Sequence, residues 1–175
     1  QLPYQTTLQD NAYIIYTSGT TRRSKGIVIR HEALMSRWAS LWLLEEITDK
    51  DRIAQFFDTH VDPTIMELLL AFCSGASLCM TSLPRLQFVT NIHKVFAALK
   101  ISSAMLPPTL LRNLIKDKDD APIFLEKYFF DLDKLMPTTE PIDAKTLKMW
   151  GTSVKGGAIR RRFNGYGHTE TTVGS

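Results

Sequence analysis

The sequence of 175 residues lacks most features that mark specialised protein classes. It has two cysteines, Cys73 and Cys79, and no CxxC pair, which excludes a disulfide framework and a cysteine zinc knuckle. Its longest apolar stretch, Ile65 to Cys73, is interrupted by Glu67 and is far shorter than the roughly 20 residues that span a membrane. A formal net charge of +3 is too small for a protein that binds nucleic acid through charge alone.

The remaining composition is that of a globular domain. Hydrophobic residues make up 44% of the sequence and charged residues 22%, and no repeat, low-complexity tract or linker interrupts it. We therefore expect a single domain over 1–175, or one piece of a larger domain. Because no basic, apolar leader opens the sequence and the two thiols suit a reducing compartment, we expect a soluble, cytoplasmic protein.

Short strand and helix patterns alternate along the sequence. Strands are predicted at 12–16, 27–29, 52–57, 76–80, 102–106, 127–130 and 161–166. Helices are predicted from residue 31 to 44 and at 64–74, 91–99, 109–115 and 143–150. A capping box, Thr64 with Glu67, is expected to start the second helix, and Thr90 to cap the third. This alternation predicts an α/β fold in which helices flank a layered, mostly parallel sheet.

The first candidate site follows the strand at 12–16. The segment is Thr17-Ser18-Gly19-Thr20-Thr21-Arg22-Arg23-Ser24-Lys25-Gly26. Gly19 allows close backbone approach, the hydroxyls and loop N–H groups can donate to phosphate oxygens, and Lys25 supplies a compact positive charge. The order differs from a Walker P-loop, because Lys25 is followed by Gly26 and a strand pattern instead of a helix. The composition alone fits a polyphosphate-binding loop and a polar hairpin equally well.

The second candidate site follows the last predicted strand. The segment is Asn164-Gly165-Tyr166-Gly167-His168-Thr169-Glu170. The Tyr166 ring can stack on a purine, and Asn164 can hydrogen-bond the edge of a base. Thr169 can donate to a phosphate, and Glu170 offers an oxygen ligand for Mg²⁺. Taken alone, the segment also fits a loop with an exposed tyrosine and a Thr-Glu helix start.

The two segments together resemble the signatures of the adenylate-forming enzymes. The first is similar to Y-T-S-G-[ST]-T-G-x-P-K-G and the second to N-x-Y-G-P-T-E, in the same order. Between them, 55–67, 74–78 and 106–109 resemble the adenylation domains of nonribosomal peptide synthetases. The resemblance implies the central part of that family's large N-terminal subdomain, without the subdomain's N-terminal part and without the small C-terminal subdomain.

The resemblance implies that an amino acid reacts with ATP and Mg²⁺ to give an aminoacyl-adenylate. The product would be transferred to phosphopantetheine on a peptidyl carrier domain, beside a condensation domain of the same megasynthase. It implies phosphate binding by the first segment, at Thr17, Ser18, Gly19, Thr20, Thr21, Lys25 and Gly26. It implies adenine binding by Asn164 and Tyr166, α-phosphate binding by Thr169 and Mg²⁺ binding by Glu170. The implied catalytic residues are Lys25, Thr169 and Glu170.

The same register implies a site for the amino-acid substrate. Asp62 falls where these domains keep the carboxylate that pairs with the substrate ammonium; local helix capping is its alternative role. The implied side-chain pocket is lined by Pro63, Met66, Met105, Met136, Thr138, Gly165, Val173 and Gly174. Its three methionines make an adaptable wall of little charge. The start of this pocket is similar to fungal siderophore synthetases that load acylated hydroxyornithines.

Several residues depart from the family pattern. Arg22 and Ser24 replace a usual Gly and Pro, His168 replaces a Pro, and Thr138-Thr139 stands where Gly-Gly is common before Glu. Each change stiffens or crowds backbone that lies close to nucleotide in the family. Two alternatives therefore stay open. One is an acyl-CoA or aryl-acid ligase of the same superfamily, which Asp62 disfavours because a carboxylate there selects amino acids. The other is a degenerate, non-catalytic module.

Overall fold

The parallel sheet predicted from the sequence is present in the computed structural model of the chain, which describes residues 5–17, 24–116, 118, 120–152, 161–162 and 165. The strand order is β4-β3-β5-β6-β7, and every neighbouring pair is parallel. The strands are β3 (Arg52–Ala54), β4 (Ser77–Cys79), β5 (Ser103–Leu106), β6 (Lys134–Pro137) and β7 (Arg161–Arg162). The layered α/β expectation is therefore confirmed.

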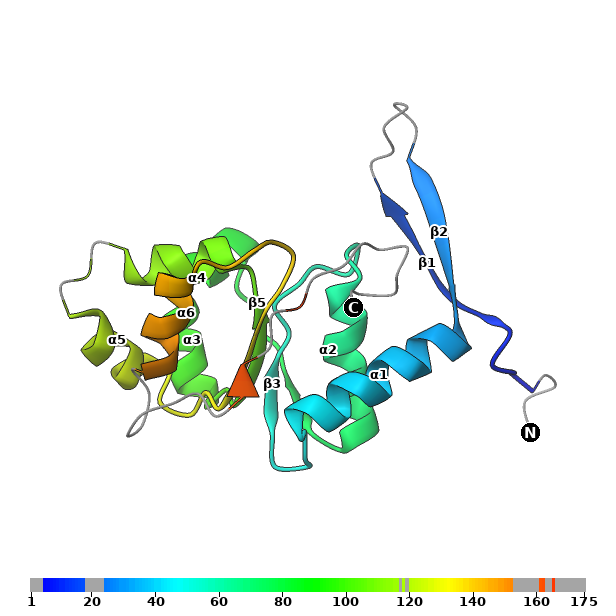
Figure 1. Ribbon diagram of the computed structural model, residues 1–175, viewed down its shortest axis with the longest axis horizontal. Coiled ribbons are helices and arrows are strands. Elements are labelled where there is room, and N and C mark those ends of the chain that lie inside the picture. Colours follow the sequence, from blue (N-terminus) through cyan, green and yellow to red (C-terminus); the bar gives the residue numbers. More distant parts are fainter. Residues whose placement is uncertain are drawn as a thin grey trace.

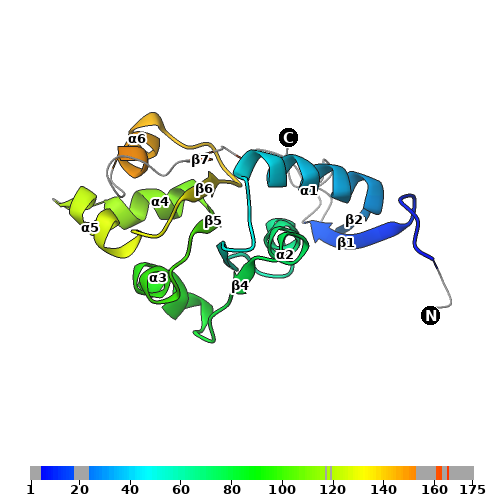
Figure 2. The ribbon, with the colours of Figure 1, turned by 90° about the horizontal axis from the view of Figure 1, so that it is seen from below.

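Helices cover both faces of this sheet. Figures 1 and 2 show α1 and α2 on one side and α3, α4, α5 and α6 on the other. Their bounds are α1 (His31–Glu45), α2 (Pro63–Ser74), α3 (Arg85–Leu99), α4 (Pro108–Ile115), α5 (Ala121–Tyr128) and α6 (Ala144–Thr152). Among the described helices, none combines the length and hydrophobicity needed to cross a membrane.

A separate antiparallel hairpin lies beyond α1 and α2 (Figure 1). It is formed by β1 (Asn11–Thr17) and β2 (Lys25–Arg30). Side chains alternate between its two faces, so Ile15 and Ile27 are buried against the domain whereas Ile14 and Tyr16 are exposed. The hairpin confirms the strand prediction on both sides of the first candidate loop.

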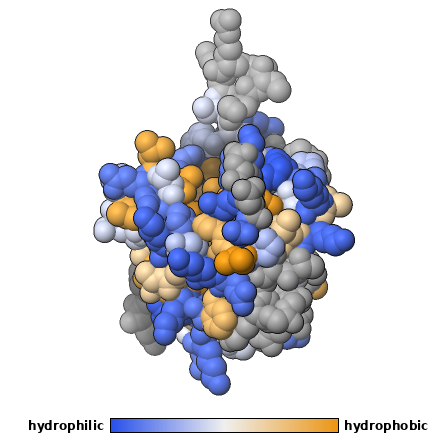
Figure 3. Space-filling view, turned by 90° about the vertical axis from the view of Figure 1, so that its left-hand side faces the viewer, coloured by the Kyte–Doolittle hydropathy of each residue, from blue (hydrophilic) through white to orange (hydrophobic). Residues whose placement is uncertain are grey.

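One continuous hydrophobic core fills the space between the sheet and the helices. On the side of α3 to α6, Trp150 is fully buried, meets the Phe129 ring edge-to-face at 4.9 Å, and donates its ring N–H to the Leu111 carbonyl at 3.2 Å. The outer surface over the α5 end of the molecule is mainly hydrophilic, with scattered apolar side chains (Figure 3). The helices therefore turn their apolar faces inward, as an α/β layer requires.

Helix α2 begins close to its predicted start, but the capping box predicted there is wrong. The Thr64 hydroxyl donates to the Asp58 carbonyl at 2.8 Å, and no side chain caps the first turn. The buried Glu67 carboxylate instead accepts hydrogen bonds from the Phe56 and Phe57 N–H groups, because the chain beyond β3 leaves these donors without a strand partner. The predicted end at Gly75 is confirmed: its φ of 71° lies in the left-handed region that glycine adopts readily.

Three further boundary predictions need correction. The strand predicted at 127–130 is wrong, because its first two residues end helix α5 and the other two lie in the turn that follows. Ala121, Leu125 and Phe129 are buried at four-residue spacing. The β-forming aromatic residues there concealed this helical period. Helix α3 begins six residues before the predicted Asn91, and Thr90 is not its cap. Asn91 nevertheless interrupts the helical geometry, with φ −111° and ψ 15°.

A buried polar cluster lies at the amino ends of the strands. The Lys134 ammonium is 2.6 Å from Asp51 Oδ1, which also accepts from the Ser102 hydroxyl at 2.8 Å. Burial opposes ionisation of Asp51, but its hydrogen bonds from Lys134, the Thr48 backbone and Ser102 lower its pKa. Nearby Glu45 is buried, and this burial raises its pKa to about 7. This cluster stands at the sheet edge opposite the predicted site.

Candidate functional site

The hairpin holds together the two ends of the predicted phosphate loop. Thr17 and Lys25 are paired in the β1–β2 register. Lys25 and Gly26 are exposed, and Thr17 is half-buried. A Cβ added at Gly26 would lie 3.3 Å from the Tyr16 ring, so a glycine there lets the ring lie close to the backbone. The other predicted phosphate ligands, Ser18, Gly19, Thr20 and Thr21, lie outside the described residues.

The carboxyl ends of β5 and β6 bring several predicted substrate residues together. Met105 and Met136 are paired in register, and both are buried. Beyond β6, Thr138 forms a parallel bridge with Gly165, whose N–H donates to the Pro137 carbonyl at 2.8 Å. A Cβ at Gly165 would lie 3.1 Å from the Thr138 hydroxyl and 3.3 Å from the Met136 sulfur. Four predicted pocket residues thus lie side by side.

The amino end of α2 carries the other described substrate residues. Pro63 is the first residue of α2, where its missing N–H costs no helical hydrogen bond. Asp62 precedes it in helical geometry, with φ −63° and ψ −30°. Met66 is fully buried in the core cluster that also contains Met105 and Met136. All three methionines of the predicted pocket are therefore buried in the core of the domain, and Met105 and Met136 are paired across adjacent strands.

A tyrosine that the sequence reasoning missed lies near Asp62. Tyr13 is on β1, and its hydroxyl oxygen is buried without a hydrogen-bond partner among the described residues. The pKa of Tyr13 is raised to about 12, mainly by burial and to a smaller extent by the negative charge of Asp62. The strand that leads into the predicted phosphate loop therefore brings Tyr13 close enough to Asp62 to feel its charge.

The carboxylate of Glu67 reinforces the segment that precedes Asp62. Burial raises the pKa of Glu67 to about 8, against the effect of the two N–H groups that it accepts from. These bonds join α2 to the chain that leaves β3. Glu67 was predicted to act within its own helix, so this long-range role was not foreseen.

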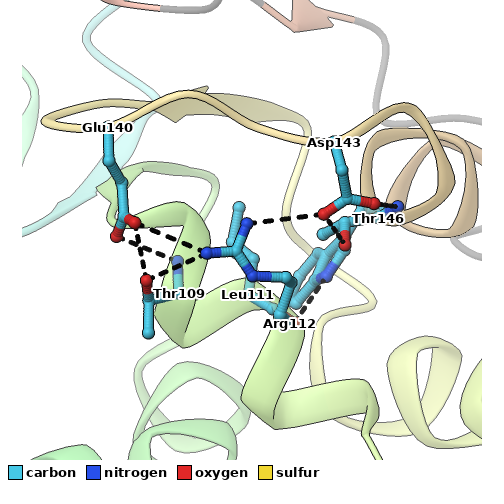
Figure 4. A network of polar contacts seen from close by, with 7 residues as sticks. Thr109, Leu111, Arg112, Glu140, Asp143 and Thr146 are labelled. Atoms are coloured by element: carbon cyan, nitrogen blue, oxygen red, sulfur yellow. Dashed lines mark hydrogen bonds and ion pairs between the residues drawn. The ribbon is translucent and has the colours of Figure 1, made fainter.

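A polar network links α4, the loop after β6 and the start of α6 (Figure 4). Glu140 accepts from the Thr109 N–H at 3.1 Å and from its hydroxyl at 2.7 Å. These two bonds lower the pKa of Glu140. Arg112 extends one guanidinium nitrogen to Glu140 and another to Asp143, at 3.4 Å each. Asp143 in turn accepts from the backbone and hydroxyl of Thr146, and these bonds lower its pKa to about 2.

This network holds a turn of unusual backbone geometry. Thr139, between Thr138 and Glu140, has φ 80°, a region that β-branched residues rarely adopt. The family pattern places Gly at this position, and the observed φ gives the physical reason. No part of this network was predicted from the sequence. Within it, Asp143 and Thr146 are close enough in sequence for a local pattern, that of a helix N-cap, to indicate their contact.

The remaining predicted site residues lie outside the described part of the chain. They are Asn164, Tyr166, Thr169, Glu170, Val173 and Gly174. Within the described residues, no three His, Cys, Asp or Glu side chains gather closely enough to hold a metal ion. A pocket of about 170 Å³ after β3 and β4 is lined by Asp58 and Arg85 among others, and contains none of the predicted site residues.

Sequence comparison relates the chain to a large enzyme family. The sequence model of the AMP-binding enzymes matches residues 2–175. Chondramide synthase cmdD of Chondromyces crocatus is 31% identical over 173 residues, covering 99% of this chain and 4% of that protein. Tyrocidine synthase 1 of Brevibacillus parabrevis is 26% identical over 164 residues, covering 94% of this chain and 14% of that protein. The chain spans 1% to 14% of the length of such curated relatives.

Solved structures of other proteins have the same fold as this chain. The Vibrio cholerae adenylation domain AlmE, solved with glycyl-adenosine-5'-phosphate, has a TM-score of 0.79 at 19% identity, over 99% of this chain and 31% of that one. The nonribosomal peptide synthetase FmoA3, solved with AMPPNP, has a TM-score of 0.78 at 20% identity, over 96% of this chain and 17% of that one. At these identities, the likeness shows the fold alone.

Proposed function

The chain belongs to the AMP-binding enzyme family, and from this premise we propose that it is the central part of an amino-acid adenylation domain of a nonribosomal peptide synthetase. The observation that carries the proposal is the bridge from Thr138 to Gly165. It sets the start of the second signature segment against the carboxyl end of β6, where open α/β sheets bind their ligands. Met105 and Met136 lie beside it as a candidate apolar pocket.

In the proposed reaction, a carboxylate oxygen of the amino acid attacks the α-phosphorus of ATP. The new O–P bond forms as the bond from the α-phosphorus to the bridging oxygen breaks, and pyrophosphate leaves. The thiol of a carrier-bound phosphopantetheine then attacks the carbonyl carbon, and AMP leaves. Protein groups mainly position the reactants and screen charge.

The proposed roles of the first segment follow from charge and hydrogen bonding. Lys25 and the hydroxyls from Thr17 to Thr21 hold the β- and γ-phosphates, and Gly26 keeps the backbone beside them uncrowded. An exposed Lys25 opposite Thr17 on adjacent strands fits a polyphosphate held across the mouth of the loop.

The second segment binds the rest of the nucleotide in this proposal. Asn164 and Tyr166 hold adenine, Thr169 the α-phosphate, and Glu170 the Mg²⁺. When bound, Mg²⁺ neutralises charge on the phosphate oxygens. Glu170 supplies a carboxylate oxygen of the kind that Mg²⁺ prefers.

The proposed substrate is an amino acid whose ammonium pairs with Asp62. Its side chain enters a pocket of Pro63, Met66, Met105, Met136, Thr138, Gly165, Val173 and Gly174. The pliable methionine wall favours a long polar-apolar side chain, so we propose an acylated hydroxyornithine in siderophore assembly. Carrier and condensation domains of the same megasynthase are the proposed partners, in the cytoplasm; the unpaired state of Cys73 and Cys79 is compatible with that compartment.

The proposal is tested by ATP–pyrophosphate exchange with the complete domain that contains this chain. The panel includes amino acids, N-hydroxyornithine derivatives, their deamino analogues, fatty acids and aryl acids. We expect exchange with amino acids only. Preference for fatty or aryl acids would identify an acyl-CoA or aryl-acid ligase, and no exchange together with no stabilisation by Mg-ATP would identify a non-catalytic module.

The role of Asp62 is tested separately by Asp62→Asn. Removing the partner of the substrate ammonium is expected to lower kcat/KM about a hundredfold for the amino acid and to leave the deamino analogue unaffected. Asp58→Asn is the matched control, since Asp58 is an exposed carboxylate four residues earlier. If Asp62→Asn still prefers amino acids over deamino analogues, the substrate register is wrong.

A further inference from the structure

The loop after β6 is fixed at two points on either side of Thr139. On one side, the Thr138 N–H donates to the Leu106 carbonyl at 3.1 Å, and Thr138 bridges Gly165. On the other side, the Glu140 carboxylate is held by the first turn of α4, through Thr109. Between these two points the backbone adopts the costly φ of 80°. The Glu140 attachment therefore fixes the turn that directly follows Thr138, the residue that bridges Gly165.

Arg112 is the residue that completes this attachment. Its Nη2 lies 3.4 Å from Glu140 and donates to the Thr109 hydroxyl at 3.1 Å, while its Nη1 reaches Asp143 at 3.4 Å. Figure 4 shows the guanidinium between the two carboxylates. A planar guanidinium can bridge two carboxylates from separate nitrogens, which a single ammonium cannot do with the same geometry. Arg112 thus joins both ends of the 140–143 loop to α4.

Global stability does not account for this arrangement. The side chains of Arg112 and Glu140 are 40% and 35% exposed, and ion pairs of this exposure contribute little to unfolding free energy. These ion pairs are better explained by a local role, because a small interaction free energy is enough to hold one turn of the loop in place.

We propose that Arg112 is a positioning residue for the nucleotide: acting through Glu140, it holds the Thr138–Glu140 turn against Gly165 so that this edge of the site is formed before ATP binds. The inference rests on the proposed function, in which Asn164 and Tyr166, the neighbours of Gly165, hold adenine. A preformed edge lowers the ordering cost of binding. Losing it therefore weakens ATP binding without altering the reacting groups.

The test is Arg112→Gln in the complete domain, with steady-state exchange measured against ATP and against the amino acid. We expect the KM for ATP to rise about tenfold, with kcat and Tm nearly unchanged. The amino-acid KM should rise less, although Thr138 and Gly165 also line the proposed side-chain pocket. Arg112→Lys should restore part of the loss, because an ammonium can still contact one carboxylate. Arg85→Gln is the matched control: its side chain is 42% exposed and pairs with Asp58, away from this loop.

A double variant tests the route through Glu140. If Arg112 acts through it, Arg112→Gln with Glu140→Gln is no worse than Glu140→Gln alone, since residues in one network are not additive. Additive losses would overturn the inference. An unchanged KM for ATP in Arg112→Gln, equal rises in both KM values, or the same effect from Arg85→Gln would also overturn it.

Failure of the proposed function is recognised by a different result. If the unmodified domain exchanges with no carboxylic acid, that function fails, and calorimetric titration with Mg-ATP then decides the positioning role. An affinity that falls about tenfold in Arg112→Gln supports the role. Equal affinities, or no binding by the unmodified domain, refute it.

Discussion

Thr139→Gly is expected to stabilise the protein. The φ of 80° at Thr139 costs a β-branched residue about 1–3 kcal/mol, which glycine does not incur. Glycine loses about 0.5–1 kcal/mol through the greater entropy of the unfolded chain. Because the Thr139 side chain is exposed, little buried surface is lost. The net gain in unfolding free energy is about 1 kcal/mol, or roughly 2–4 °C in Tm for a domain of this size.

The assay is urea unfolding at neutral pH, supported by thermal scans. Thr59→Gly is the matched control, since Thr59 is an exposed threonine in a turn outside the left-handed region. This control should lose about 0.5–1 kcal/mol, because it gains only the entropic penalty. If both variants lose the same stability, the backbone at Thr139 is not strained, and the reasoning about the Glu140 attachment fails with it.

Three further predictions concern buried ionisable side chains. The folded pKa of Glu45, about 7, lies above its ordinary value, so Glu45 contributes to the unfolding free energy in acid and this contribution is lost as pH rises through 7. Glu45→Gln should therefore be more stable than wild type at about pH 9 but not at about pH 5. Urea titrations at the two pH values measure this difference. Lys134→Met leaves the Asp51 charge buried and unpaired, and should cost about 3–5 kcal/mol; a loss below about 1 kcal/mol would contradict that pairing. Glu67→Ala removes the acceptor of two buried N–H groups and should cost about 2–4 kcal/mol, with faster amide exchange at Phe56 and Phe57 as its specific signature.

The sequence predicted most of the fold because its local signals agreed with the tertiary structure. Gly75 was predicted to end α2, and it does so in a left-handed conformation. The alternation of short strand and helix patterns predicted the parallel sheet that the structure has. Strand β6 was not predicted, since Lys134 and Pro137 are poor strand formers. All four of its residues are buried between neighbours that only the folded sheet supplies.

The candidate site was predictable only where it carries a contiguous motif. The signature segments identified the family. The strand pairing places Met105, Met136, Thr138 and Gly165 side by side, and their role as a substrate pocket stays a prediction. The attachment of Glu140 could not be predicted, because its partner Thr109 lies 31 residues away and no local pattern joins them.

The network around Arg112 also has a consequence for protein engineering. A chimera of this chain and a relative could be joined at one of the loops between α4 and Glu140. Any crossover there would inherit Thr109 and Arg112 from one parent and Glu140 and Asp143 from the other, although these side chains are in direct contact. Grafts that transplant 109–143 as one cassette would keep the native partners together.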